Sequence, residues 1–249
     1  YILPAFFIFL SFYILTQGVI FLRDDICTIP VSEVFEKKDG CPICRMYETV
    51  EEHLLDYILG DAMMEPDVRI ETNKTGFCTA HFDKMLARRG RLQLALMLET
   101  HIKSVGDSIF EKKLFNPPAK KAQKSKELTD SCFICDKIEW GMSRMLETVC
   151  RCYENERDFR ELFNSQPMFC LPHYERLIGC IDKRKMPHYG SEMAENLTRI
   201  TGGYVRSLSE DISQYCKMYD YRSRSGDADW GNSRDSVERT VGFLTGRTL

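Results

Sequence analysis

Two pairs of cysteines and two cysteine–histidine pairs are the residues whose types and spacing could bind a metal ion. Each Cys-x-x-Cys pair is followed by a Phe-Cys-x-x-His segment. The eight residues are Cys41, Cys44, Cys78, His81, Cys132, Cys135, Cys170 and His173. Three thiolates and one imidazole complete the tetrahedral coordination of a structural zinc site. The sequence therefore predicts two Zn²⁺ ions per chain.

These motifs belong to an internal tandem repeat. Nine residues of the first half are identical to residues of the second half at an offset of 91, and the Phe-Cys-x-x-His segments match at an offset of 92. Identity at a fixed offset indicates a duplicated structural unit. We therefore expect each repeat to hold one zinc ion with its own ligands. The predicted sets are Cys41, Cys44, Cys78 and His81 in the first repeat, and Cys132, Cys135, Cys170 and His173 in the second.

Other roles for the cysteines leave part of this pattern unexplained. Free buried cysteines or disulfides would give the two histidines no function, although disulfides would suit an exported chain. A thioredoxin-like redox pair needs a βαβ context, which the sequence does not contain. An iron–sulfur cluster is the remaining chemical alternative, because a histidine can replace a cysteine among its ligands. Zinc accounts for all eight residues.

The composition is that of a globular protein. The chain has 249 residues, of which 43% are hydrophobic and 29% charged, and this composition excludes a disordered chain. A formal net charge of -3 provides no overall attraction to nucleic acid or to an anionic membrane. The 11 cysteines are an odd number, which excludes a complete disulfide framework.

Hydrophobic periodicity predicts an all-α fold, because no segment alternates as a strand would. Residues 45–59 and 136–150 each carry one apolar stripe, and longer amphipathic segments cover 91–113 and 189–221. A shorter helix over 233–244 is expected to pack on the core through Val237, Val241 and Leu244. Cys78 and Cys170 precede strongly helical sequence, so we expect them at helix starts, where the dipole stabilises a thiolate.

The expected organisation is one zinc-stapled helical repeat over residues 26–113 and a second over 131–222. Between them, residues 114–130 are rich in lysine and include Pro117 and Pro118, which predicts a linker. Residues 223–249 are expected to form a tail that contains the short amphipathic helix. A small basic cluster consists of Arg88, Arg89 and Arg91.

A Glu-x-Asp-x-Arg element is the other polar motif found in both repeats, 21 residues after the second cysteine of each Cys-x-x-Cys pair. Its members are Glu65, Asp67 and Arg69, and Glu156, Asp158 and Arg160. One hypothesis makes these acids catalytic or ligand-binding groups in a cleft between the halves. The hypothesis that we favour makes each element a helix start, with acids at the dipole and the arginine in a local ion pair. His53 and His101 have no counterparts and are expected to be ordinary helix residues.

Residues 1–22 contain no charged side chain and would span about 33 Å as a helix, enough to cross a bilayer. The segment predicts a transmembrane anchor or a removable leader. Arg23, Lys37 and Lys38 follow it, so the positive-inside rule places the globular part in the cytoplasm. Reduced, metal-binding thiols agree with that compartment.

Three stretches of the sequence resemble a bacterial family known only as a domain of unknown function. They are ICTIPVSEVFEKKDGCPICRMYE, MEPDVRIETNKTGFCTAHF and FCLPHY. The resemblance covers about residues 26–246 and includes the duplicated Cys/His pattern by which that family is recognised. Members begin near the Ile-Pro-Val segment, so the apolar residues before Arg23 depart from the family pattern. The resemblance implies no established activity.

The predicted function is that of a structural zinc-binding helical module that binds another protein or a small ligand. Four protein ligands leave no position for a metal-bound water, and the sequence has no phosphate loop, nucleophile elbow or dinucleotide fingerprint, so an enzyme is disfavoured. One alternative is a nucleic-acid-associated regulator that uses the basic cluster and the lysine segment. The other is an enzyme that uses the Glu-x-Asp-x-Arg elements. Membrane contact is expected only through residues 1–22.

Overall fold

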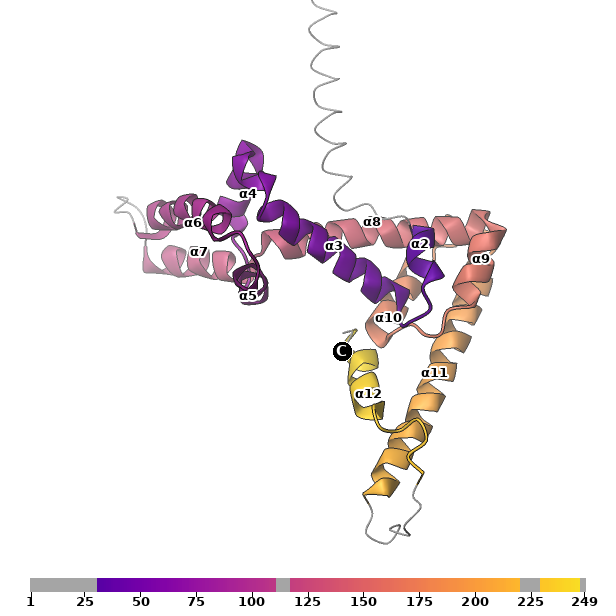
Figure 1. Cartoon of the computed structure of the whole chain (residues 1–249). Helices are drawn as coiled ribbons and strands as arrows, with labels where there is room; N and C mark the ends of the chain where they lie inside the picture. Colours follow the sequence, from indigo (N-terminus) through magenta and orange to yellow (C-terminus); the bar gives the residue numbers. More distant parts are fainter. Residues whose placement is uncertain (1–30, 111–116, 220–228, 247–249) are drawn as a thin grey trace, which may run out of the picture. The chain divides into compact units, whose positions relative to one another are not determined.

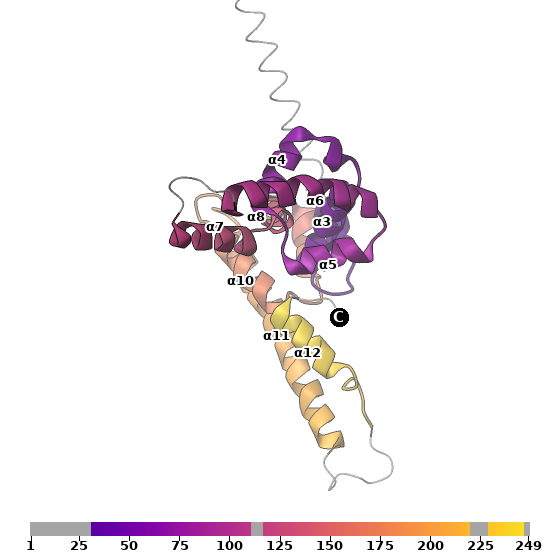
Figure 2. The same cartoon turned by 90° about the vertical axis from the view of Figure 1, so that its left-hand side faces the viewer.

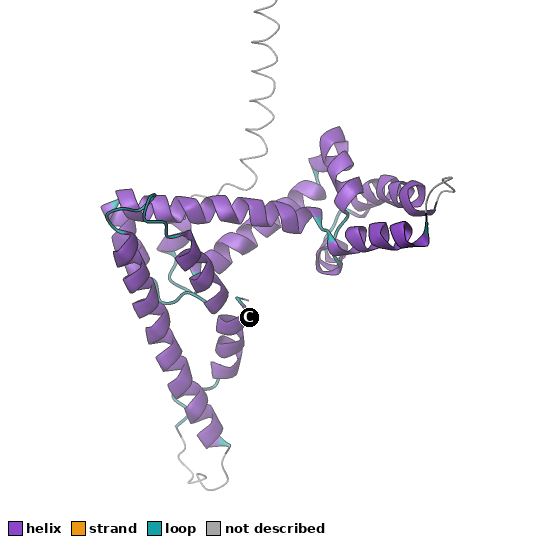
Figure 3. Cartoon of the chain, turned by 180° about the vertical axis from the view of Figure 1, so that it is seen from behind, coloured by secondary structure: helices purple, strands orange, loops and turns teal. Residues whose placement is uncertain are grey.

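The computed structural model describes residues 31–110, 117–219 and 229–246, and within these residues the chain is helical without any strand (Figures 1 and 3). The prediction of an all-α fold is therefore confirmed. The first part of the chain contains α2 (Val31–Glu36), α3 (Pro42–Ile58), η1 (Asp61–Met64), α4 (Pro66–Thr75), α5 (Thr79–Ala87), α6 (Arg91–Val105) and η2 (Gly106–Phe110). The second part contains α7 (Pro118–Asp130), α8 (Phe133–Asn155), α9 (Arg157–Asn164), α10 (Leu171–Cys180), α11 (Gly190–Met218) and α12 (Ser236–Thr245).

The described chain forms two compact units that do not coincide with the two sequence repeats. Unit 1 contains residues 49–110 and 117–142, and unit 2 contains residues 31–48, 143–219 and 229–246. The long helices α3 and α8 each contribute residues to both units. Each unit is therefore built from parts of both repeats.

The apolar stripes of α3 and α8 form the core, as their periodicity predicts. The stripe residues that are buried are Met46, Val50, Leu54 and Ile58 on α3, and Ile138, Met142, Met145, Leu146 and Val149 on α8. Residues spaced three or four apart share one helix face, so each stripe removes a continuous apolar strip from water. Burial of each such side chain contributes roughly 1.5–3 kcal/mol to the free energy of unfolding.

In unit 1, α4 packs against α6 and also contacts α7 (Figure 2). The linker expected over residues 114–130 is for the most part α7, a helix that contacts α4 and η2. Pro118 occupies the first turn of α7, where a missing N–H costs nothing, and alanine, lysine and glutamine are good helix formers. Good helix propensity therefore outweighs the polar composition that suggested a linker.

In unit 2, α12 packs against α10 and α11, but on a different face from the one predicted (Figure 1). Val237, Val241 and Leu244 are exposed by 41%, 44% and 52%, while Ser236 and Phe243 are buried. Phe243 lies against the ring of Tyr204 of α11, with 5.9 Å between centroids. Arg239 of α12 also forms an ion pair at 3.0 Å with Asp211 of α11. The face that carries Phe243 and Arg239 therefore meets α11, and the prediction for the aliphatic stripe is wrong.

The expected localisation, a cytoplasmic chain with an N-terminal membrane anchor, is corrected by the structure. Among the helices in the described residues, none combines the length and the apolar character needed to cross a membrane. Residues 1–22, on which the anchor prediction depends, lie outside the described residues. The structure therefore provides no support for membrane anchoring.

Candidate metal centres

Two groups of four side chains converge, and each is a Cys₃His set. The unit 2 cluster consists of Cys41, Cys44, Cys170 and His173. The unit 1 cluster consists of Cys78, His81, Cys132 and Cys135. Within each group the four ligand atoms lie within 4.8 Å of one another, so each group could hold a metal ion. In the described part of the chain no cysteine forms a disulfide.

The eight predicted residues thus come together, but the predicted grouping is wrong. Each cluster combines the Cys-x-x-Cys pair of one repeat with the Cys-x-x-His pair of the other. The reason is the long helix that follows each Cys-x-x-Cys pair. From Cys44 to the end of α3 the chain rises about 21 Å, and α8 is longer still. The short helices that follow each long helix belong to a different unit from its Cys-x-x-Cys pair.

Backbone contacts show how the unit 1 cluster is assembled. At the end of α4, the carbonyl of Gly76 accepts a hydrogen bond from the Phe133 N–H at 2.9 Å. Next to it, the Ser131 hydroxyl donates to the Thr75 carbonyl at 2.7 Å. These two bonds join the segment before Cys78 to the segment that carries Cys132, so cysteines from both repeats meet. Gly76 has a φ of 62°, a left-handed conformation that favours glycine at this junction.

In the unit 2 cluster, three packed phenylalanine rings join the two segments that carry the ligands. The ring of Phe35 on α2 lies 5.8 Å from that of Phe163 and 6.4 Å from that of Phe169. The side-chain amide of Gln166 donates to the Phe35 carbonyl at 2.6 Å. These contacts hold the segment before Cys41 against the segment before Cys170. All three phenylalanine rings are buried, so the packing is apolar as well as directional.

The helix starts match the prediction for the Cys-x-x-His pairs. Cys78 is the N-cap residue of α5, and Cys170 is the N-cap residue of α10. Each histidine follows within the first turn, so its side chain lies on the same side as the capping cysteine.

The distances fit a tetrahedral ion. Two sulfurs bonded at ~2.3 Å to one tetrahedral ion are about 3.8 Å apart, and a sulfur and a histidine nitrogen are about 3.6 Å apart. The sulfurs of Cys44 and Cys170 are separated by 3.6 Å, and those of Cys78 and Cys135 by 3.9 Å. Nδ1 of His173 lies 3.7, 3.3 and 3.1 Å from the three sulfurs of its cluster. Nδ1 of His81 lies 3.1, 3.3 and 3.4 Å from its three sulfurs.

The pKa values of the unit 1 cluster residues are also consistent with a cation-binding site. Burial opposes ionisation of Cys132, yet its hydrogen bonds, above all from His81, lower its pKa to about 6. Desolvation and the charge of Cys132 then raise the pKa of Cys135. Burial opposes a charged imidazole, but hydrogen bonds to Cys132 and Glu51 raise the pKa of His81 to about 10. The negative charge of the Cys132 thiolate thus opposes ionisation of Cys135. A bound divalent cation would offset the repulsion between the two thiolates.

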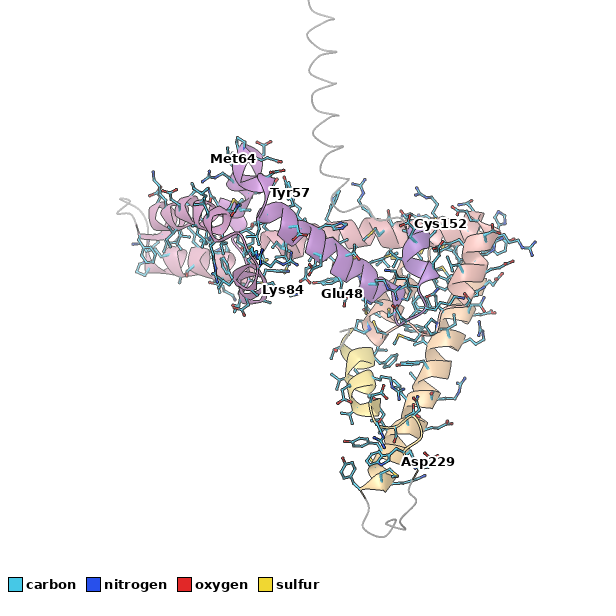
Figure 4. The ribbon with its side chains drawn as sticks, viewed as in Figure 1. Glu48, Tyr57, Met64, Lys84, Cys152 and Asp229 are labelled. Carbon is cyan, nitrogen blue, oxygen red and sulfur yellow. The ribbon has the colours of Figure 1, made fainter. Side chains whose placement is uncertain are left out.

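Glu51 is a site residue that the sequence interpretation missed. It is buried on α3, and its Oε1 lies 3.1 Å from Nε2 of His81. Its other oxygen accepts a bond from Lys84 at 2.5 Å, and Lys84 is labelled in Figure 4. A carboxylate on the second nitrogen fixes the tautomer and orientation of a metal-binding histidine. At the repeat offset, Glu51 corresponds to Met142, so a comparison of the two repeats could not reveal its role. The sequence signal that could have identified Glu51 is an acidic residue directly after Val50, a residue of the apolar stripe.

Glu51→Gln is expected to weaken zinc binding at the unit 1 cluster by roughly 10–100-fold, because the neutral amide orients His81 less firmly. The unit 2 cluster should keep its affinity, since Glu51 contacts neither Cys170 nor His173. Competition titration with a chromophoric chelator measures both sites. Glu52→Gln is the matched control, because Glu52 is the exposed neighbour of Glu51. Equal loss at both clusters in Glu51→Gln would contradict the assignment.

The Glu-x-Asp-x-Arg elements are helix starts. Glu65 and Glu156 are the N-cap residues of α4 and α9, and Asp67 and Asp158 lie in the first turns. The arginines do not pair with these acids as predicted, but donate to carbonyl oxygens. Arg69 donates to Leu96 at 2.9 Å, and Arg160 donates to Tyr153 at 3.0 Å while its guanidinium lies 3.8 Å from the Tyr189 ring centre. The acids lie at the positive ends of the helix dipoles, and the arginines bind backbone carbonyl oxygens. Both interactions stabilise the local fold.

One residue of the predicted basic cluster, Arg88, is paired with acidic neighbours. Arg88 forms ion pairs with Glu52 and with Asp56, the latter at 2.5 Å. Arg91 donates to the Leu86 carbonyl at 2.8 Å. A phosphate backbone would have to compete with these carboxylates for Arg88.

A pocket of about 480 Å³ lies beside the unit 2 cluster. Its wall includes three of the cluster's ligands, Cys41, Cys44 and Cys170, and residues of α12. Asp235 and Arg239 provide charge, and they are paired with each other at 2.9 Å. The volume is in the range of small-molecule sites.

Comparison with known proteins gives one match. A model described as "Family of unknown function (DUF6062)" matches residues 22–249. No curated protein and no solved structure matches the chain significantly. The expected resemblance is confirmed at the level of a family of unknown function, while a bacterial origin and a Cys/His signature of the family stay predictions.

Proposed function

The chain belongs to the DUF6062 family of unknown function, and from its two Cys₃His clusters we propose that it is a zinc-stabilised helical module. Each cluster would hold one Zn²⁺ through its four ligands, Cys41, Cys44, Cys170 and His173 in unit 2 and Cys78, His81, Cys132 and Cys135 in unit 1. The observation that carries the proposal is the convergence of four zinc-type donor atoms, twice, from helices of different repeats.

A structural role accounts for these sites better than a catalytic one. Three cysteines and one histidine satisfy tetrahedral zinc, so no coordination position stays open for water or substrate. Each cluster joins segments more than 50 residues apart, such as Cys78 with Cys135 and Cys44 with Cys170. Metal binding at such a site contributes directly to folding.

Metal analysis of the purified chain tests the proposal. Native mass spectrometry and elemental analysis of reduced protein are expected to give two zinc ions per chain, because each cluster is a complete ligand set. The double variant Cys152→Ser/Cys216→Ser, which leaves both clusters intact, should keep both ions. A brown protein that contains iron and sulfide would contradict zinc, and a metal-free folded chain would contradict the whole proposal.

We further propose that the module binds a small polar ligand in the pocket beside the unit 2 cluster. The combination of an aromatic wall, from Tyr204 and Phe243, with the charged side chains of Glu238 and Arg239 supports this use. Thermal-shift screening of the zinc-loaded chain against polar metabolites should find a stabilising compound whose effect disappears in Glu238→Lys. Glu195→Lys, at another exposed glutamate that lies on α11 outside the pocket lining, should retain the effect. A screen without any such compound would favour a protein partner instead.

A further inference from the structure

The sulfur ligands of the two clusters differ in their exposure to solvent. The three cysteines of the unit 2 cluster are buried, with exposed fractions between 1% and 5%. In the unit 1 cluster Cys132 is buried, but Cys78 is half-buried and Cys135 is exposed. A dissolved reagent can therefore reach a sulfur of the unit 1 cluster much more easily than a sulfur of the unit 2 cluster.

The local structure explains this difference. Cys135 lies in the first turn of α8, between the buried Ile134 and the exposed Asp136. In unit 2, Gly246 at the end of α12 packs on the cluster, since a Cβ added to it would lie 3.5 Å from the sulfur of Cys170. The three unit 2 cysteines also line the pocket beside their cluster, yet at most 5% of each of them is exposed.

Sulfur–sulfur distances by themselves would favour disulfide formation in unit 2. The sulfurs of Cys44 and Cys170 are 3.6 Å apart, and those of Cys78 and Cys135 are 3.9 Å apart. Both pairs are close enough that a modest shift would bring them to the disulfide bond length of about 2.05 Å. Thiol–disulfide exchange begins, however, with contact between one protein sulfur and the dissolved reagent, so its rate depends on access. Exposure therefore favours reaction in unit 1.

From this contrast, and resting on the proposed zinc sites, we propose that the unit 1 cluster is a redox-sensitive zinc site and the unit 2 cluster a resistant one. The oxidant is a low-molecular-weight disulfide. The Cys135 thiolate attacks one sulfur of the reagent, which forms a mixed disulfide and releases one thiolate. The Cys78 thiolate then attacks the Cys135 sulfur, which forms the Cys78–Cys135 bond and releases the second thiolate. Two protein thiolates are oxidised, and one reagent disulfide is reduced to two thiolates.

This reaction would remove two of the four ligands of the unit 1 cluster. His81 and Cys132 would remain, and two protein ligands do not complete a tetrahedral zinc site. Unit 1 would therefore lose its ion together with the folding free energy that the ion contributes, while unit 2 would keep both. Reduction of the Cys78–Cys135 bond would restore the ligand set, so the change is reversible.

Oxidation of the full zinc-loaded chain with glutathione disulfide tests the inference. Zinc content is measured by native mass spectrometry before oxidation, after oxidation, and after reduction in the presence of added zinc. We expect two ions per chain at the start, one after oxidation and two again after reduction. A chain without zinc at the start would contradict the proposed function and this inference together. Two ions that leave at the same rate would overturn this inference alone.

Peptide mapping without reductant identifies the bond that forms. Chymotryptic cleavage after Phe133 separates Cys132 from Cys135. The oxidised chain should contain peptide 78–82 linked to peptide 134–140, and the link should disappear after reduction. No link should form between Cys44 and Cys170. A bond between Cys132 and Cys135, or a bond in unit 2 before one in unit 1, would overturn the inference.

Two substitutions separate this reaction from unspecific oxidation. Cys135→His replaces the exposed thiolate by an imidazole, which is also a zinc ligand. This variant should lose the linked peptides, and glutathione disulfide should no longer release any zinc that it holds in unit 1. Cys216→Ser is the matched control, because Cys216 is an exposed cysteine outside both clusters. It should release one ion as the unsubstituted chain does, and unchanged zinc in this control would show that the release depends on Cys216 instead.

Discussion

The double variant Cys78→Ser/Cys132→Ser is expected to retain one zinc ion per chain, and Cys41→Ser/Cys78→Ser is expected to retain none. The reason is the crossed grouping: Cys78 and Cys132 belong to the unit 1 cluster, whereas Cys41 and Cys78 belong to different clusters. Loss of one thiolate from a four-ligand site weakens zinc binding strongly. When both lost thiolates belong to the same site, the other site keeps all four of its ligands. Native mass spectrometry with a mild competing chelator measures the stoichiometry.

The same two variants separate the crossed grouping from a grouping within each repeat. If each repeat held its own ion, Cys78→Ser/Cys132→Ser would lose both ions and Cys41→Ser/Cys78→Ser would keep one. The two hypotheses thus predict opposite results for both proteins. Cys152→Ser should keep two ions and shows that a cysteine substitution as such does not release zinc.

His173→Ala is expected to unfold unit 2 while unit 1 stays folded. Zinc binding in small structural sites contributes on the order of 10 kcal/mol to folding, so the loss of a ligand should cost several kcal/mol of a total stability of about 5–15 kcal/mol. Hydrogen exchange should show lost protection in residues 31–48 and 143–219, with protection retained over residues 49–110. The melting temperature of the variant should also stop responding to added zinc at this site.

His188→Ala is the matched control for this experiment, because His188 is an exposed histidine of the same unit and lies outside the cluster. It should leave both the exchange pattern and the zinc content unchanged. Unchanged protection in His173→Ala would show that the unit 2 cluster does not stabilise the fold. The outcome would then favour a reactive over a structural role for its thiols.

The amino-acid sequence by itself determined the helical fold and the eight cluster residues. Apolar residues such as Met46 and Val50 recur with the helical period, and this local property does not depend on the rest of the chain. The Cys-x-x-Cys and Cys-x-x-His spacings are equally local, because each places two ligand atoms on one helical turn. The helix starts at Cys78 and Cys170 could be predicted for the same reason.

Only the tertiary structure decided which pairs meet. Both groupings satisfy the same spacings, and the choice follows from the length of α3 and α8 and from long-range contacts such as Gly76 with Phe133. The role of Glu51 was also hidden, because Glu51 is not duplicated and its partner His81 lies far away in the chain. The outward orientation of Val237 on α12 has the same cause, since the Phe243–Tyr204 contact outweighs a short stripe of aliphatic residues. Periodicity and spacing report on one helix at a time, whereas the pairing of helices depends on packing that no single segment encodes.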